Sequence, residues 1–175
     1  LKNIVESNHR KVECLEKENI LRANFFSERL DFTELTKPDR DHFREDWHRK
    51  ALAALAGNSI VCVDPDNGLI VPSALGKPKE NKYVLRDELA DYYAQQASVI
   101  YYQHKARKPD EFYVRQHKEL INSQCFPNAK GLALKFITTS QRYYFFIMQP
   151  QHQAIIEEAI NHMMSTAWNE HFKIL

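Results

Sequence analysis

Glycine is scarce in this sequence, with four residues in 175, and no apolar run reaches the length of about 18 residues that a membrane-spanning helix needs. The shortage of glycine excludes collagen-like repeats. The apolar share of 43% and the charged share of 27% are those of a folded chain rather than a disordered one. We therefore expect a globular protein with no membrane partner.

The sequence also lacks a large excess of positive or of negative residues. Twenty-four Lys and Arg residues stand against 23 Asp and Glu residues, so the formal net charge is +1. Proteins that bind nucleic acid or anionic membranes through their overall charge are strongly basic. Any site for an anionic ligand in this protein must therefore be local.

Cysteine is sparse too. Cys14, Cys62 and Cys125 are widely spaced and form no CxxC pair, which excludes a disulfide framework and a cysteine zinc site. The chain begins with Leu1 rather than Met and shows no signal-peptide pattern. We therefore expect a cytoplasmic protein, and elements upstream of Leu1 can belong to the full-length chain.

What the sequence does contain is a regular succession of helix and strand patterns. Apolar residues at helical spacing predict helices over 39–56, over 85–96, between Pro109 and Pro127, and, as a long closing helix, over 151–172. Short apolar runs predict strands over 59–63 and 98–102, and the segments 131–139 and 142–149 indicate an antiparallel hairpin. Residues 11–15 and 24–32 fit either a strand or part of a helix, and both alternatives stay open.

These patterns favour a particular fold. The strands over 59–63 and 98–102 lack the alternation of a half-exposed strand, which is typical of parallel strands covered on both faces. The helices between the strands fit right-handed crossovers. We therefore predict one α/β domain over residues 1–175, a three-layer, Rossmann-like, mostly parallel sheet with a C-terminal antiparallel β-hairpin and a long closing helix.

Ligands of open parallel sheets bind beyond the carboxyl ends of the strands. In this sequence the two predicted strands are followed by polar segments, Asp64-Pro65-Asp66-Asn67-Gly68 and Gln103-His104-Lys105-Ala106-Arg107. If the strands are neighbours, carboxylates, an imidazole, amides and cations converge on one edge of the sheet. Such a set suits acid–base, metal or phosphate chemistry.

Asp64, Asp66 and His104 are the candidate catalytic residues. A carboxylate at the end of a buried strand is costly without a partner, and a histidine beside cations changes its charge near neutral pH. The candidate substrate-binding residues come from the same two segments and the basic stretch after the first: Pro65, Asn67, Gly68, Lys82, Tyr83, Gln103, Lys105 and Arg107. The alternative is a structural turn with solvated basic loops, which needs no ligand.

The succession of elements over 39–149 resembles the second half of class I S-adenosylmethionine-dependent methyltransferases, whose sheet closes with an antiparallel hairpin strand. Within it, Asp64-Pro65-Asp66-Asn67 looks like the Asp/Asn-Pro-Pro-Tyr motif of enzymes that methylate amino groups of nucleic-acid bases. Asp66 replaces the second proline of that motif, and Asn67 replaces its aromatic residue.

This resemblance implies that Asp64 accepts a hydrogen bond from the target amine and that S-adenosylmethionine is the cofactor. The substrate would be nucleic acid or another phosphate-bearing molecule, held by His104, Lys105 and Arg107. The family holds its cofactor with a Gly-rich loop after the first strand, and this chain has no glycine before Gly57. Either the cofactor loop lies upstream of Leu1, or the fold has no such cofactor site.

Two other classes of protein fit the same residues. The segment Ile60-Val61-Cys62-Val63-Asp64-Pro65-Asp66 also resembles the Asp-x-Asp signature of haloacid-dehalogenase-like phosphatases, which implies that Asp64 attacks phosphorus, Asp66 acts as acid and base, and magnesium binds nearby. Together with Lys82, the two carboxylates also fit a nuclease that uses magnesium or manganese. The sequence contains no HExxH pattern, so we expect no histidine metal site. The third class is a non-catalytic module that binds a partner protein or nucleic acid through its basic edge.

Overall fold

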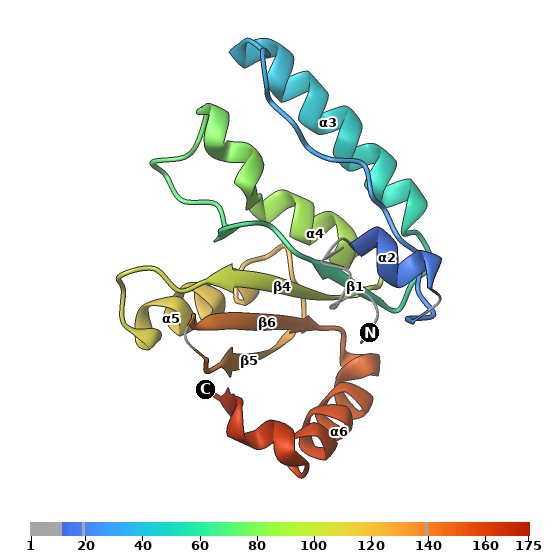
Figure 1. The fold of residues 1–175 in the computed structure, drawn as a ribbon, viewed down its shortest axis with the longest axis vertical. Coiled ribbons are helices and arrows are strands. Elements are labelled where there is room, and N and C mark those ends of the chain that lie inside the picture. Colours follow the sequence, from blue (N-terminus) through green and yellow to red (C-terminus); the bar gives the residue numbers. More distant parts are fainter. Residues whose placement is uncertain (1–11, 19, 139) are drawn as a thin grey trace. The chain divides into compact units, whose positions relative to one another are not determined.

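The computed structural model of the chain describes residues 12–18, 20–138 and 140–175 (Figure 1). Its contacts divide the chain into two compact units, Leu1–Asn58 and Ser59–Leu175, and each is described here by itself. The expectation of a single domain over 1–175 stays a prediction. In the described ranges, no helix is both long and apolar enough to cross a membrane.

The first unit contains the helices α2 (Val12–Lys17) and α3 (Lys37–Ala54). The first turn of α3 holds Pro38, whose fixed φ suits a helix start, and Asp39, whose charge complements the helix dipole. The helix predicted over 39–56 is confirmed within two or so residues at each end. Residues 24–32 form neither a helix nor a strand, and the other ambiguous segment, 11–15, begins outside the described residues and continues into α2.

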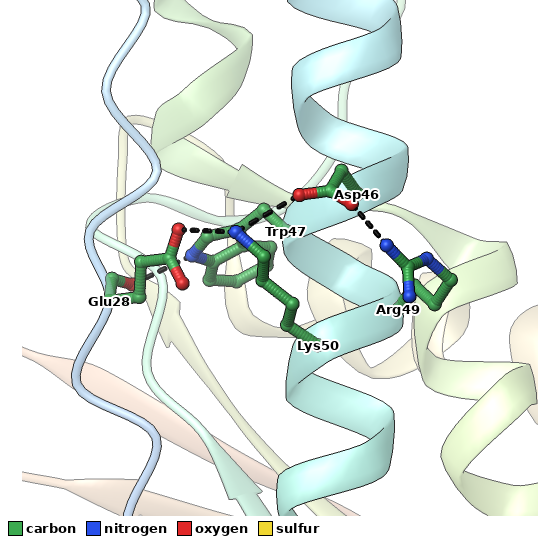
Figure 2. A network of polar contacts seen from close by, with 5 residues as sticks. All are labelled: Glu28, Asp46, Trp47, Arg49 and Lys50. Carbon is green, nitrogen blue, oxygen red and sulfur yellow. Dashed lines mark hydrogen bonds and ion pairs between the residues drawn. The ribbon is translucent and has the colours of Figure 1, made fainter.

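Polar contacts attach the segment before α3 to this helix (Figure 2). Trp47 donates from Nε1 to the backbone carbonyl of Glu28 over 2.7 Å. Lys50 Nζ lies 3.2 Å from Glu28 Oε1 and 3.0 Å from Asp46 Oδ2, and Asp46 also pairs with Arg49. Exposed ion pairs contribute little to stability, so among these contacts the indole hydrogen bond is the stronger attachment.

The second unit is built on a five-stranded sheet whose strands lie in the order β1-β4-β6-β5-β7. The strands are β1 (Ile60–Val63), β4 (Ser98–His104), β5 (Lys130–Phe136), β6 (Arg142–Met148) and β7 (Phe172–Ile174). β1 pairs with β4 in parallel, whereas the pairs β4–β6, β6–β5 and β5–β7 are antiparallel. The expected hairpin is the β5–β6 pair.

The prediction of a mostly parallel, Rossmann-like sheet is therefore wrong. The described sheet is mixed, with a single parallel pair, and β6 inserts between β4 and β5 with antiparallel neighbours on both sides. The sequence could not distinguish the two cases, because the second half of β6 is buried on both faces and an antiparallel strand in that position is as apolar as a parallel one.

Helices lie on both faces of this sheet. On one face, His117 of α5 (Asp110–Ile121) stacks on Phe145 with ring centroids 4.7 Å apart. On the other face, Ile156 and Ile160 of α6 (Gln153–Met164) pack with apolar residues of β5 and β6, namely Leu134, Phe146 and Met148. A third helix, α4 (Arg86–Ala94), contacts β4.

The predicted closing helix over 151–172 is also wrong in its length. α6 ends at Met164, where the hydroxyls of Ser165 and Thr166 donate to the carbonyls of His162 and Met163 and so compete with the helical hydrogen bonds. A 3-10 turn, Ala167–Glu170, follows and leads into β7. Trp168, in this turn, is 55% exposed.

A second, smaller sheet follows β1. It consists of β2 (Gly68–Leu69) and β3 (Tyr83–Val84), which pair in parallel, and a 3-10 helix, Pro78–Lys82, leads directly into β3. β2 also contacts β4. The small sheet therefore holds the segment after β1 against the segment that ends β4.

Candidate functional site

The two polar segments singled out in the sequence meet at one edge of the sheet. In the parallel β1–β4 pair, Val63 lies opposite Tyr101, so both strands end at the same edge. The backbone carbonyl of Asn67 accepts a hydrogen bond from the His104 amide over 3.3 Å. The expected juxtaposition of 64–68 with 103–107 is therefore present in the structure.

Gln103 connects the two segments through its side chain. Its Nε2 donates to the carbonyls of Asn67 and His104, each over 3.0 Å, and its Oε1 accepts from the Leu69 amide over 3.0 Å. Because the side chain is 9% exposed and its polar atoms are engaged with backbone, it positions the loop. The structure therefore gives Gln103 a structural role at this edge, and its predicted role as a ligand contact has no support from this geometry.

Gly68 has a structural role as well. Its φ is +105°, and a Cβ at this position would overlap the carboxamide of Gln103. Residue 68 must therefore lack a side chain for Gln103 to reach the Leu69 amide. Gly68 shapes the loop and leaves the ligand contacts to the residues before it.

Asp64 is exposed at the end of β1. Partial desolvation by the surrounding protein raises the pKa of its carboxyl, the charge of Asp66 raises it further, and the charge of Arg142 opposes both. Asp66 is itself exposed, and its Oδ2 lies 3.7 Å from Lys82 Nζ. The edge thus carries two carboxylates and two cations within electrostatic reach of one another.

His104 lies on the same face of the sheet as Tyr102, two residues before it in β4. Tyr102 Oη and His104 Nδ1 are 3.4 Å apart, and His104 is exposed. Opposite them on β6, the register places Tyr144 beside Tyr102 and Arg142 beside His104. This face therefore combines an imidazole, a guanidinium and two aromatic rings.

The basic residues after β4 differ in their surroundings. Lys105 Nζ lies 3.0 Å from Asp110 Oδ1, and Asp110 also accepts hydrogen bonds from Lys135 and Tyr143. Lys105 is therefore engaged in an internal network, whereas Arg107 is exposed in the loop between β4 and α5. Of these two predicted phosphate contacts, Arg107 is the one whose side chain lies in solvent.

The remaining predicted residues line the same loop. Pro65 is half-buried between the two carboxylates, and the Asn67 amide donates to the Lys82 carbonyl over 2.9 Å. Tyr83 is half-buried on β3, where its backbone pairs with Gly68 in the register of the small sheet. The backbone of 67–68 is thus fixed from two sides, and the loop holds Asp64 and Asp66 on its exposed side.

The binding of S-adenosylmethionine stays a prediction. The resemblance places the cofactor loop after another strand, and among the described residues β1 is an edge strand of the sheet. A divalent metal finds two carboxylates here, Asp64 and Asp66, and across the described ranges no three His, Cys, Asp or Glu side chains are grouped to hold a metal ion. We therefore infer a function from the ligand groups that the side chains at this edge of the sheet can bind.

Sequence reasoning missed Arg142, Tyr102 and Tyr144. Both tyrosines are half-buried, and Arg142 is the first residue of the predicted hairpin strand 142–149. An antiparallel strand beside β4 begins where β4 ends, so the first residues of β6 lie at this edge. The hairpin pattern predicts β6 itself, but Arg142 can be placed at this edge only when β6 is known to pair with β4.

Comparison with known proteins adds nothing to this geometry. No family model matches the chain, and neither a curated protein nor a solved structure matches it.

Proposed function

We propose that this edge recognises an amino group on a nucleic-acid base, or on another phosphate-bearing molecule, as the target-binding part of a methyltransferase-like protein. The observation that carries the proposal is the exposed carboxylate of Asp64 beside the charge of Arg142. An ionised carboxylate has acceptor oxygens alone, which suits an amine, and a guanidinium suits a phosphate.

Asp64 accepts a hydrogen bond from the target amine in this proposal and thereby orients it. Arg142, with the exposed Arg107, attracts the phosphate, which explains how a protein of net charge +1 has a local anion site. Methyl transfer requires a donor site that the described residues do not provide. The proposal for this chain is therefore recognition of the acceptor.

One observation favours a second candidate, a metal-dependent phosphoesterase that uses Asp64 and Asp66 with magnesium or manganese. The charge of Asp66 raises the pKa of Asp64, and a divalent cation would relieve the repulsion between the two carboxylates. However, Lys82 already lies 3.7 Å from Asp66. Target recognition is therefore the better-supported function.

The first test measures binding preference by fluorescence anisotropy. Single-stranded oligonucleotides of adenine or cytosine carry exocyclic amines, whereas those of thymine do not. We expect the protein to prefer the amino-bearing strands by about 3-fold to 10-fold, the value of one net hydrogen bond. Asp64→Ala should lose this preference because it removes the acceptor oxygens, while overall affinity through the phosphates is kept.

Asp41→Ala, at an exposed position on α3, is the matched control and should keep the preference. Equal affinity of the unmodified protein for all strands, or no binding to any of them, would overturn the proposal. The same titrations are repeated with magnesium and with manganese. Binding or strand cleavage that requires the metal and is lost in Asp66→Asn would favour the second candidate instead.

A further inference from the structure

Among the described residues of the second unit, one face of the sheet at β1 and β4 is partly exposed. Along β1, Val61 is buried, whereas Ile60 is 42% exposed and Cys62 is exposed. On β4, Ile100 and Tyr102 are half-buried on the same face. This face is opposite to that of α5, and on it Ile100 packs against the apolar cluster formed by α6, β5 and β6. The exposed Ile60 and Cys62 and the half-buried Tyr102 leave a partly exposed apolar floor beside Asp64.

Two tyrosines border this floor. Tyr102 and Tyr144 are directly opposite each other in the antiparallel β4–β6 pair, with ring centroids 6.1 Å apart and planes inclined by 68°. Tyr144 is supported from its other side by Phe172, at 6.3 Å between ring centroids. The edge-to-face contact holds the Tyr102 ring against a packed neighbour. Tyr102 therefore presents an aromatic surface that is fixed before any ligand arrives.

We infer that Tyr102, supported by Tyr144, is the stacking surface for an unpaired base of a single-stranded nucleic acid, an inference that rests on the proposed function. A base stacked on Tyr102 over the floor of Cys62 and Ile100 brings its exocyclic amine toward Asp64. Aromatic side chains that stack on bases are the usual means by which proteins hold single strands.

The charges around the floor select this occupant over an apolar peptide. His104 and Arg142 lie opposite each other in the register at the end of the aromatic pair, and Asp64 lies across the face from them. A nucleotide has a planar apolar ring, an anionic phosphate and, in adenine and cytosine, an amine, and so offers a partner to each of these groups. An apolar peptide would desolvate the carboxylate and the guanidinium without compensation.

The test compares an adenine oligonucleotide with an abasic strand of the same length, which keeps the phosphates and lacks the bases. The unmodified protein should bind the strand with bases more tightly. Tyr102→Leu should reduce that difference by about 10-fold, whereas Tyr102→Phe, which keeps the ring, should retain it. Phe43→Leu, at a half-buried position on α3, is the matched control. Circular dichroism verifies that each variant is folded.

A Tyr102→Leu variant that is folded and keeps the full difference would overturn the inference, even where the preference governed by Asp64 supports the proposed function. A loss in Tyr102→Leu together with retention in Tyr102→Phe would support it. If the unmodified protein binds neither strand, both ideas fail. A Tyr102→Leu variant whose oligomeric state changes, as measured by light scattering, would show that a second copy covers this face, and would also overturn the inference.

Discussion

The side-chain amide of Gln103 donates to the backbone carbonyl of Asn67 over 3.0 Å and thereby fastens the loop after β1 to the end of β4. The contact joins residues 36 positions apart in the chain. Because the loop also carries Asp64 and Asp66, their placement depends on a buried residue that touches neither of them. The candidate site is thus organised by a buried side chain whose polar atoms bond to backbone groups.

Gly68→Ala tests this dependence. A Cβ at residue 68 must accept positive φ and displace Gln103, so we expect the free energy of unfolding to fall by about 3 kcal/mol. Gly57 also has positive φ, but a Cβ there meets no atom within 4 Å. Gly57→Ala should therefore cost about 1–2 kcal/mol. Urea denaturation compares the two, and equal losses would argue against the role of Gln103.

The sequence predicted most elements of the second unit but not how they pair. The polar residues after β1 and β4 were recognised because a parallel pair ends at one edge, and the structure has that pair. The place of β6 beside β4, and with it Arg142, was not foreseen. Strand order depends on contacts between distant residues, whereas periodicity reports burial alone.

The sequence did not show how particular side chains are engaged. Gln103 is held by backbone groups of the loop, and a Cβ at residue 68 would overlap its carboxamide. Tyr102 lies between buried neighbours in β4 and is itself half-buried. Composition cannot distinguish a ligand contact from a structural role, because the same residue type serves either one depending on its neighbours in the fold.

His117 should make the fold sensitive to acid. It is 3% exposed, its Nδ1 lies 3.2 Å from Tyr101 Oη, and burial lowers its pKa from 6.5 to about 4, although a backbone hydrogen bond with Phe146 opposes the shift. As the pH falls, His117 therefore takes up a proton in the unfolded chain before it does so in the folded one. The contribution of neutral His117 to stability is complete above pH 6.5 and is lost progressively as the pH falls to about 4, by about 3 kcal/mol in total.

Urea denaturation at a series of pH values measures this loss. His117→Leu should flatten the dependence in that range, even if it lowers stability at neutral pH. His162→Gln, at an exposed position on α6, should leave the dependence as it is. A dependence that is unchanged in His117→Leu would contradict the assignment.

Asp110 should be a structural carboxylate. Burial disfavours its charge, but hydrogen bonds from Lys135, Tyr143 and Lys105 outweigh burial and hold its pKa well below the ordinary value. Asp110→Asn leaves the half-buried Lys135 ammonium without its counter-charge, so we expect a loss of about 1–3 kcal/mol. Thermal or urea unfolding measures it. Glu111→Gln, the exposed neighbour in the first turn of α5, should change stability little, and an equal effect of the two substitutions would count against the network.

The preference for amino-bearing strands should depend on pH through Asp64. Because partial burial and Asp66 raise the pKa of Asp64 above 3.8, protonation should remove its acceptor function at a higher pH than in an ordinary aspartate. Anisotropy titrations at decreasing pH should therefore show the preference falling while that pH is still above 3.8. Asp64→Asn corrects for titration of the bases themselves and should show no such step; a step of equal size in this variant would assign the effect to the bases.

The central claim is that the open face beside Asp64 binds a base, and nuclear magnetic resonance tests it most directly. Backbone amide shifts of the ¹⁵N-labelled protein are followed as a single-stranded adenine oligonucleotide is added. The account predicts that the perturbed amides cluster at Asp64, Tyr102, His104 and Arg142, and that Asp64→Asn or Tyr102→Leu reduces those shifts. Perturbations confined to other parts of the chain, or none at saturating oligonucleotide, would contradict it.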